Sequence, residues 1–375
     1  MRKLLKQLIS SAPTCDNGEI QAVKILQKFL KEYGINTELD CWDETHANLT
    51  ASIGSHASDA GTLVFGGHID VVPASAANWD TNPFEAVEKE GKVYGRGACD
   101  MQGGICAVAQ ALVDIAQSEI KLNGRVIFSA TAGEETDSCG VKRFIEQYKD
   151  KITRPIGTVV PEPTSLEILR AHRGILWLKI QTHGKTAHGS MPHLGINAIE
   201  KANALLNRLK DYKIPHTAHN LLGGCSMSIN RIDGGSATNI VPESCVVELD
   251  IRTLPGQNRE DVIKSIQRIC DELHENDSNF KADVSIIRTA DALETDANDP
   301  FVKAVCTATG ITRTGAASFT TDGPYFRKLN APVIIFGPGD GTLCHKPNEF
   351  IEIEQLEKAR DYYKRLILAL ITESQ

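Results

Sequence analysis

The sequence predicts an α/β fold into which a smaller ferredoxin-like α+β domain is inserted. Short apolar runs of the kind that form buried parallel strands alternate with helical segments along most of the chain. A different texture fills residues 174–289, where strands with mixed alternation surround two helices in the order β-α-β-β-α-β. A chain of 375 residues is also long enough for two domains.

The larger domain is predicted from four strands and the helices between them. The strands are expected at 62–68, 125–132, 156–161 and 331–337. Apolar residues at helical spacing predict a helix over 17–34, with Asp16 or Asn17 as its cap and Gly34 at its end. Further helices are expected over 103–117 and 354–371. This alternation is typical of a sheet covered by helices on both faces.

The smaller domain interrupts the larger one. Its helices are expected near 196–211 and 258–275. We therefore expect a discontinuous catalytic domain made of residues 1–173 and 290–375, with residues 174–289 inserted between its two parts.

The composition favours a solvated enzyme. Apolar residues make up 41% and charged residues 23%, and the formal net charge is −8, which argues against nucleic acid or an anionic membrane as the partner. The N-terminal segment has only a short, interrupted apolar run, so neither a secretory signal nor a membrane span is expected. We expect a cytoplasmic protein.

The ten cysteines are scattered singly, without a Cys-x-x-Cys pair, so reduced thiols are expected rather than a disulfide framework. Cys99 and Cys344 are each next to a candidate metal ligand described below. Neither has a partner thiol at the sequence spacing of a metal site, which makes them weak candidates for ligands.

Side chains that can bind metal follow the predicted strands, where the carboxyl ends of an open α/β sheet place a site. They comprise two imidazoles and several carboxylates: His68 and Asp70, Asp100, Glu134 and Glu135, Glu162, and His345. Taken singly, each has an ordinary explanation, such as a hydrogen-bonded surface pair, a helix cap or a solvated loop acid. Their order along the chain, which lets one sheet edge collect them, favours a common site.

Imidazole and carboxylate ligands suit Zn²⁺, and five protein ligands exceed what one catalytic zinc uses. If Asp100 bridges, His68 and Glu162 complete the ligands of one ion, and Glu135 and His345 complete those of the other. This arrangement predicts a two-metal hydrolytic centre.

Two carboxylates remain for other roles. Asp70 is expected to accept the second ring N–H of His68 and so to fix its orientation. Glu134 is expected to take a proton from the attacking water and to pass it to the leaving nitrogen. The glycine-rich segment 336–341 offers the backbone N–H groups of Gly337 and Gly339, which we expect to line the acyl or carboxylate site.

The chain resembles the M20 family of zinc amidohydrolases over essentially its full length. The motifs "GGHIDVVP", "VYGRGACDMQGG", "AGEE", "KTAHGSMPHLGINAIE" and "CHKPNE" occur in the family's order. The resemblance implies two zinc ions per subunit bridged by Asp100, replaceable by Co²⁺ or Mn²⁺, with Glu134 as the base and a cis peptide bond after Asp100. One departure is the proline before Glu162, where close relatives usually carry glycine.

The resemblance also implies that the inserted domain is a lid and dimerisation domain of a homodimer. His188 would then reach the partner's active site and stabilise the oxyanion. Asn239 and Arg252 would hold the substrate's carbonyl and carboxylate, with Arg173 as a further candidate. Arg252 could equally form an ion pair on the strand surface.

The expected activity is hydrolysis of the amide bond of a small N-acyl amino acid, of the acetylornithine deacetylase type found in arginine biosynthesis. The segment "PTSLEILRAHRG" is similar to that of acetylornithine deacetylases, and the "GRRGS" segment of desuccinylases is absent. Succinyl-diaminopimelate desuccinylase and a dipeptidase or carboxypeptidase on the same scaffold remain alternatives, as does a binding protein that has kept only the fold.

Overall fold

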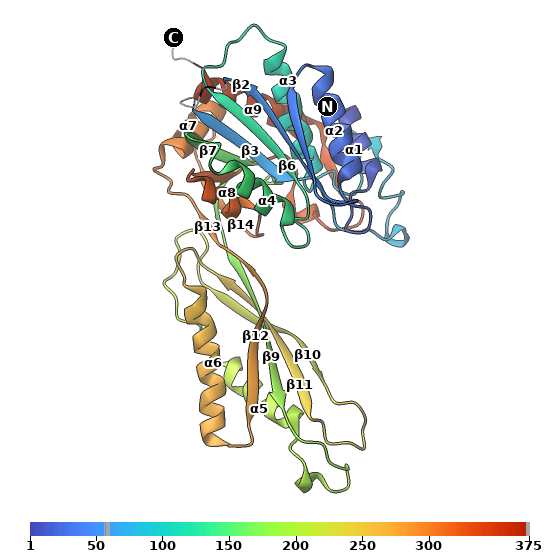
Figure 1. Ribbon diagram of the computed structural model, residues 1–375, viewed down its shortest axis with the longest axis vertical. Helices are drawn as coiled ribbons and strands as arrows, with labels where there is room; N and C mark the ends of the chain where they lie inside the picture. The colour runs from blue at the N-terminus through green and yellow to red at the C-terminus, as the bar shows by residue number, and fades with distance from the viewer. Residues whose placement is uncertain (56, 58–60, 373–375) are drawn as a thin grey trace. The chain divides into compact units, whose positions relative to one another are not determined.

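The computed structural model describes residues 1–55, 57 and 61–372, and the chain divides into two compact units (Figure 1). The first unit comprises Met1–Arg170, Glu294–Ala317 and Thr321–Gln375, and the second comprises Ala171–Leu293 with Ser318–Thr320.

A nine-stranded mixed sheet forms the first unit. The strands follow the order β1-β2-β6-β3-β7-β15-β8-β13, and β14 pairs with β8. Their bounds are β1 (Asn36–Cys41), β2 (Ala47–Gly54), β3 (Thr62–His68), β6 (Arg125–Thr131), β7 (Pro155–Val160), β8 (Ile168–His172), β13 (Leu293–Glu294), β14 (Thr314–Ala317) and β15 (Val333–Ile335). The predicted α/β class is therefore confirmed, and each of the four expected strands is present within a few residues of its predicted bounds.

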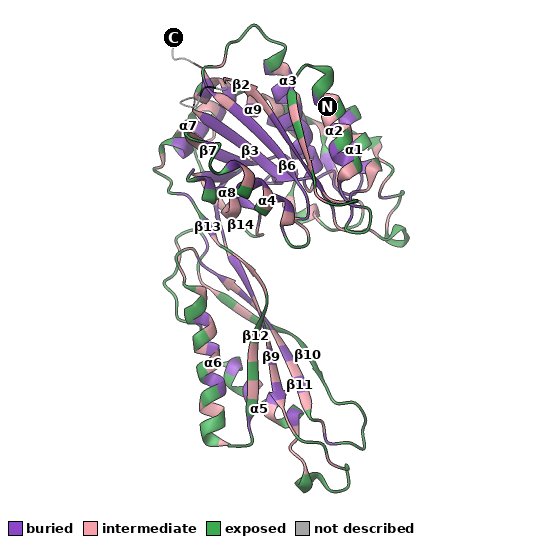
Figure 2. Cartoon of the chain, in the orientation of Figure 1, coloured by how far each residue is buried: buried purple, intermediate pink, exposed green. Residues whose placement is uncertain are grey.

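Helices cover both faces of this sheet. They are α1 (Arg2–Ser11), α2 (Ile20–Glu32), α3 (Gln102–Ala116), α4 (Cys139–Tyr148), α7 (Pro300–Thr309), α8 (Gly323–Phe326) and α9 (Ile353–Ile371). Two adjacent glycines of β3 show the two faces: a Cβ on Gly66 would meet Phe326 of α8, whereas one on Gly67 would meet Met101 and Ile105 beside and in α3. Figure 2 shows the central strands β3 and β6 almost wholly buried.

The start of α2 differs from the prediction. The helix begins at Ile20 with Glu19 in the cap position, not Asp16 or Asn17. The side-chain amide of Asn17 instead donates to the carbonyl of Ala12, at the end of α1. Asn17 therefore stabilises the turn between α1 and α2 rather than the start of α2. The residue pattern of α2 alone does not predict this contact.

The first unit also contains a small antiparallel sheet of three strands. It contains β4 (Val87–Lys89), β5 (Lys92–Tyr94) and β16 (Phe350–Glu352), in the order β16-β5-β4. Short 3₁₀ helices complete the secondary structure: η1 (Ala76–Asn78), η2 (Pro192–Leu194), η3 (Arg327–Leu329) and η4 (Gly341–Leu343).

The second unit is an antiparallel sheet with two helices. Its elements are β9 (Gly174–His183), α5 (Ala198–Lys210), β10 (Ser226–Gly234), β11 (Ser244–Thr253), α6 (Arg259–Asn276) and β12 (Lys281–Ala290), and the strand order is β10-β11-β9-β12. Alternate residues of β9 and β11 are buried beneath α5 and α6, which gives this unit its own core.

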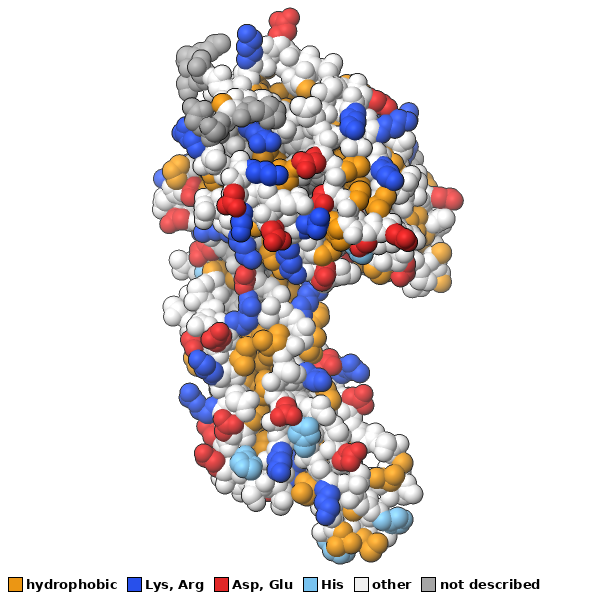
Figure 3. Space-filling model, viewed as in Figure 1, with side chains coloured by type: hydrophobic (Ala, Val, Ile, Leu, Met, Phe, Trp, Pro, Cys, Tyr) orange, Lys and Arg blue, Asp and Glu red, His pale blue; other side chains and the backbone are white. Residues whose placement is uncertain are grey.

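Charged side chains of both signs are interspersed on the face of the molecule drawn in Figure 3. None of the helices in the described part of the chain is long and apolar enough to cross a membrane.

Candidate metal centre

The strand order of the first unit brings the candidate residues to one edge of its sheet. β3 is parallel to both β6 and β7, and β7 is parallel to β15, so their carboxyl ends lie at the same edge. His68 is the last residue of β3, and the segments carrying Glu134, Glu162 and His345 follow β6, β7 and β15. This topology is the reason that residues from 68 to 345 can meet.

His68 faces two carboxylates. Its Nε2 atom lies 3.2 Å from Oδ1 of Asp100 and 3.6 Å from Oε1 of Glu162. The side chain of His68 is only 2% exposed, so these groups meet away from bulk water.

His345 faces the other side of Asp100. Its Nε2 atom lies 3.3 Å from Oδ2 of Asp100 and 3.0 Å from Oε1 of Glu135. The two oxygens of Asp100 thus face one imidazole each. His68, Asp100 and Glu135 offer ligand atoms within 4.8 Å of one another, which is close enough for a shared cation site. The peptide bond after Asp100 is cis, as the family resemblance implies.

The second ring nitrogen of His68 has a different partner from the one expected. Its Nδ1 lies 3.0 Å from the backbone carbonyl oxygen of Asp70, whereas the nearest carboxylate oxygen of Asp70 is 3.6 Å away. A carbonyl can only accept, so Nδ1 carries the proton and Nε2 is the atom directed at the carboxylates. The imidazole is oriented as expected, but by the backbone rather than by the side chain.

The carboxylate of Asp70 is used elsewhere. Its two oxygens accept hydrogen bonds from the backbone N–H groups of Glu134 and Glu135, each at 3.1 Å. Two charge-assisted bonds to adjacent residues fix the loop that carries both glutamates. Asp70 therefore connects the end of β3 to the end of β6.

Negative charge dominates this centre. Burial lowers the pKa of His68, but the charges and hydrogen bonds of Glu162, Asp100 and Asp70 outweigh it and raise the pKa well above its ordinary value. Burial likewise opposes ionisation of Asp100, yet hydrogen bonds from His345 and His68 hold its pKa well below the usual range. The hydrogen bonds with Asp100 and Glu135 raise the pKa of His345 to about 10.

Two glutamates show the opposite effect. Burial raises the pKa of Glu134 and of Glu162 well above the ordinary value, although the charge of His68 lowers both. Asp322 adds to the rise at Glu134. Carboxyl groups outnumber the imidazoles at this centre, and a bound cation would favour their ionised forms.

Three further buried residues of the first unit were not singled out from the sequence. Glu349 accepts hydrogen bonds from the backbone N–H groups of Cys99 and Asp100, at 2.9 and 3.1 Å. Arg96 forms an ion pair with Glu349 and donates to the carbonyl of His345 at 3.2 Å. This pair joins the segments that carry Asp100 and His345. Asp322 is 2% exposed, and burial raises its pKa to about 7.

The glycine-rich segment differs from the expectation. The N–H of Gly337 donates to the hydroxyl of Thr164, and the N–H of Gly339 donates to the side chain of Gln355 in α9. Because both donors are already used within the protein, they are not free for a substrate. The sequence could not show that side chains distant along the chain would take these two N–H groups.

Four predicted residues belong to the second unit. The segments of His188 and Asn239 lie side by side, since the N–H of Gly189 donates to the carbonyl of Asn239 at 2.7 Å. Arg252 forms an ion pair with Asp250, which is the alternative considered from the sequence. Arg173 donates to the carbonyls of Leu222 and Gly224. Their roles toward a substrate stay predictions.

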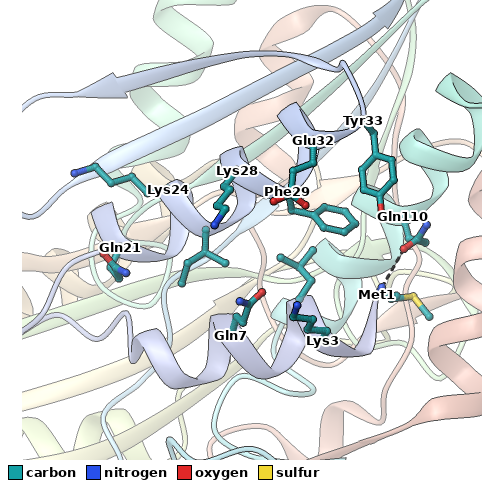
Figure 4. Close-up of a pocket in the computed structure, with 12 residues that line it drawn as sticks. Met1, Lys3, Gln7, Gln21, Lys24, Lys28, Phe29, Glu32, Tyr33 and Gln110 are labelled. Atoms are coloured by element: carbon teal, nitrogen blue, oxygen red, sulfur yellow. Dashed lines mark hydrogen bonds between the residues drawn. The ribbon is translucent and has the colours of Figure 1, made fainter.

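A separate hollow of about 570 Å³ lies beside α1 and α2 (Figure 4). Its lining includes Lys3, Lys24 and Lys28, together with the rings of Phe29 and Tyr33. None of its lining residues belongs to the cluster around Asp100. This hollow is therefore distinct from the candidate metal centre.

The chain is similar to a known protein family and to individual curated proteins. The profile of peptidase family M20/M25/M40 matches residues 64–369. Similar curated proteins include acetylornithine deacetylase from Proteus mirabilis, 31% identical and covering 94% of this chain and 90% of its own length. The acetylornithine deacetylase from Myxococcus xanthus is 29% identical, and the match covers 98% of this chain and 96% of that protein. A probable succinyl-diaminopimelate desuccinylase from Staphylococcus epidermidis is 29% identical, and the match covers 96% of this chain and 95% of that protein.

Solved structures share the fold at lower identity. Aminopeptidase PepT from Bacillus cereus has a TM-score of 0.81 at 19% identity and covers 98% of this chain and 97% of its own. An M20 family metallo-carboxypeptidase from Sulfolobus solfataricus has a TM-score of 0.80 at 19% identity, with 98% of each chain covered. The likeness therefore extends along the whole chain.

Proposed function

The chain belongs to peptidase family M20/M25/M40, and from this membership we propose that it hydrolyses the amide bond of a small N-acyl amino acid with two divalent metal ions, zinc first among them. The observation that carries the proposal is the placement of two imidazoles on opposite sides of Asp100, each facing a further carboxylate. Imidazole and carboxylate groups are the ligands that zinc prefers when sulfur is not used.

The donor set fits two ions. His68 and Glu162 would hold one ion and Glu135 and His345 the other, with one oxygen of Asp100 directed at each. The Nδ1–H of His68 donates to a carbonyl, which leaves Nε2 as the ligand atom. Co²⁺ and Mn²⁺ prefer similar ligands and are expected to substitute.

Bound divalent ions polarise the amide carbonyl and make the attacking water more acidic. Glu134 takes the proton of that water and delivers it to the departing nitrogen. Burial first of all raises the pKa of Glu134, and a higher pKa makes a carboxylate a stronger base toward water. Asp70 keeps this glutamate in place through the backbone N–H of Glu134.

The second unit would complete the site. In this proposal two chains form a homodimer, and His188 of one copy donates to the oxyanion formed in the other, a contribution of about 3 kcal/mol for such a donor. Asn239 and Arg252 would bind the substrate's carbonyl and carboxylate. The support for these roles is the family resemblance of their motifs, and the exposure of His188 is compatible with it.

The preferred substrate is an N-acetyl amino acid of the acetylornithine type. The segment "PTSLEILRAHRG" supports this preference over a desuccinylase. The curated relatives carry both names at nearly equal identity, so they support the N-acyl amino acid class more strongly than one acyl group. Arginine biosynthesis is the process in which an acetylornithine deacetylase would act, and a cytoplasmic location follows from that assignment.

The test is a turnover assay of zinc-loaded protein on matched N-acetyl and N-succinyl amino acids and on dipeptides, with the released amine as the readout. Selective release from an N-acetyl amino acid is the expected result. Release only from N-succinyl substrates would overturn the preference for an acetyl group, and release only from dipeptides would overturn the N-acyl amino acid class. Either result would leave the metal centre intact. The same assay on His188→Ala, with native mass measurement, tests the contribution of a second subunit.

A further inference from the structure

One buried ion pair connects the two segments that carry Asp100 and His345. Arg96 lies shortly before Asp100 in the sequence, and its partner Glu349 lies shortly after His345. The side chain of Arg96 is 4% exposed and that of Glu349 is completely buried. The guanidinium lies over the ring of Trp79, with Cζ 5.3 Å from the ring centroid. The pair is therefore shielded from water, where a contact between opposite charges is strong.

Each member of this pair holds the backbone of one of the two segments. Oε1 of Glu349 accepts hydrogen bonds from the N–H groups of Cys99 and Asp100, at 2.9 and 3.1 Å. Nη2 of Arg96 donates to the backbone carbonyl of His345 at 3.2 Å. Two side chains thus form a continuous series of contacts from the backbone of Asp100 to the backbone of His345.

The two imidazoles of the centre are supported in different ways. His68 ends strand β3, and its ring Nδ1 donates to the backbone carbonyl of Asp70. Its backbone N–H also donates to Sδ of Met101 at 3.2 Å. His345 belongs to no strand or helix, and none of the described residues forms a hydrogen bond with its Nδ1. Its side chain is 52% exposed, so the position of this imidazole depends mainly on the contacts of its backbone.

We propose that the Arg96–Glu349 pair positions His345 and thereby sets the affinity of the metal ion that this imidazole would bind. This inference rests on the proposed function, because it assumes that His345 is a ligand. In the described part of the chain, neither member of the pair hydrogen-bonds to His68 or Glu162. The ion at those two ligands would therefore be affected only through the bridging carboxylate.

The geometry of an arginine suits this role. A guanidinium offers several N–H donors in one plane, so Arg96 binds Glu349 and the carbonyl of His345 at the same time. A lysine would keep the positive charge but lacks the planar fork that reaches both partners. Removing a group that orients a metal ligand typically lowers metal affinity about 10- to 100-fold. Arg96→Lys should therefore weaken the binding of the ion at His345 and leave the other ion nearly unaffected.

The test measures zinc affinity in two backgrounds of the full chain that each keep one of the proposed ions. In His68→Ala the ion at His345 and Glu135 should remain. In His345→Ala the ion at His68 and Glu162 should remain. Competition with a chromophoric chelator gives the affinity, and circular dichroism confirms that each protein is folded. We expect Arg96→Lys to lower zinc affinity about 10- to 100-fold in the His68→Ala background and to change it little in the His345→Ala background.

Two further variants separate this role from a general effect on the fold. Glu349→Gln removes the charge that binds Arg96, so it should lower zinc affinity in the same background, and it serves as an independent variant should Arg96→Lys fail to fold. Arg143→Lys is the matched control, because it changes a different arginine ion pair of the first unit, that with Asp40. It should leave zinc affinity unchanged in both backgrounds.

Equal losses of affinity in both backgrounds, or no loss in the His68→Ala background, would overturn the positioning role. A wild-type chain that binds one zinc ion or none would contradict this inference together with the two-metal proposal. None of these readouts depends on turnover. A chain that shows the expected difference between the backgrounds but cleaves no amide would therefore contradict only the proposed hydrolysis.

Discussion

At the residue scale, one carboxylate organises two others. Asp70 accepts the backbone N–H groups of both Glu134 and Glu135, so the two glutamates share a rigid support. Of these two glutamates, Glu135 is the one whose carboxylate lies against His345. Adjacent residues of the same type can therefore take different roles, one as a ligand and one as a base.

Changing Glu134 to Gln should remove proton transfer and leave the metal ligands in place. We expect kcat to fall about 10²- to 10⁴-fold, the range of a positioned acid–base group, while zinc content stays at the wild-type level. Steady-state kinetics and elemental analysis of the same preparation check this expectation. Glu146→Gln, an exposed change in α4, is the matched control. A metal-loaded Glu134→Gln protein with normal turnover would rule out this glutamate as the base.

Glu19 should make stability depend on pH. It is 2% exposed, and burial together with the negative charge of Asp70 raises its pKa to about 7, against 4.5 in an unfolded chain, with His46 lowering and Asp43 raising it to smaller extents. The unfolded state releases this proton first, so raising the pH from 4.5 to 7 favours unfolding. The loss is about 3 kcal/mol by linkage.

Urea denaturation across this pH range, with and without Glu19→Gln, measures the contribution. The variant should lose less stability than the wild type as the pH rises. Glu32→Gln, an exposed change at the end of α2, should follow the wild type. Parallel pH profiles for the wild type and Glu19→Gln would show that Glu19 does not titrate in this interval.

The residues of the candidate centre other than Asp100 were predictable because each follows a strand of the large sheet, and the strand ends of an α/β sheet converge. Asp100 lies instead between β5 and α3. Arg96, Glu349 and Asp322 were not singled out, because their importance depends on contacts between distant segments. The two partners of Asp70 were missed for a related reason. The sequence spacing predicted that the Asp70 carboxylate would accept a hydrogen bond from His68. In the structure the backbone carbonyl of Asp70 accepts from Nδ1 of His68 instead.

At the scale of elements, β3 depends on small residues. Gly66 and Gly67 allow layers on opposite faces to approach the strand just before His68. A Cβ on Gly66 would lie 2.1 Å from the ring of Phe326, a distance that no packed side chain tolerates. The glycines of "GGHIDVVP" are thus required by packing on both faces of β3.

Gly66→Ala should therefore destabilise the fold by about 1–3 kcal/mol, the usual cost of overpacking a core. Combining it with Phe326→Leu should recover part of this loss, because the smaller side chain makes room for the methyl group. Denaturant unfolding of the two single variants and the double variant checks the coupling. Strictly additive effects would show that the methyl group does not meet the Phe326 ring.

The order and type of the elements followed from periodicity, whereas their ends did not. α2 begins at Ile20 rather than near residue 17, because Asn17 bonds to the end of α1. The strand expected over 331–337 is limited to Val333–Ile335. Local patterns identify a helix or strand, but the contacts that end it come from other parts of the chain.

At the scale of the whole molecule, the first unit is built from separate stretches of the sequence. The first unit gathers residues before and after the second, and its proposed ligands span His68 to His345. Bound metal would therefore join segments from both parts of that unit and stabilise it by mass action, by about 2.7 kcal/mol when the free ion is at 100 times its dissociation constant.

The most direct test of the account is the number of zinc ions bound per chain, measured by elemental analysis after gel filtration, in the wild type, His345→Ala and Asp100→Ala. We predict two ions in the wild type, one in His345→Ala, and loss of tight binding of both in Asp100→Ala, with native-like circular dichroism confirming that each variant is folded. A wild-type protein that binds one ion or none, or folded variants that bind as many ions as the wild type, would contradict the two-metal centre.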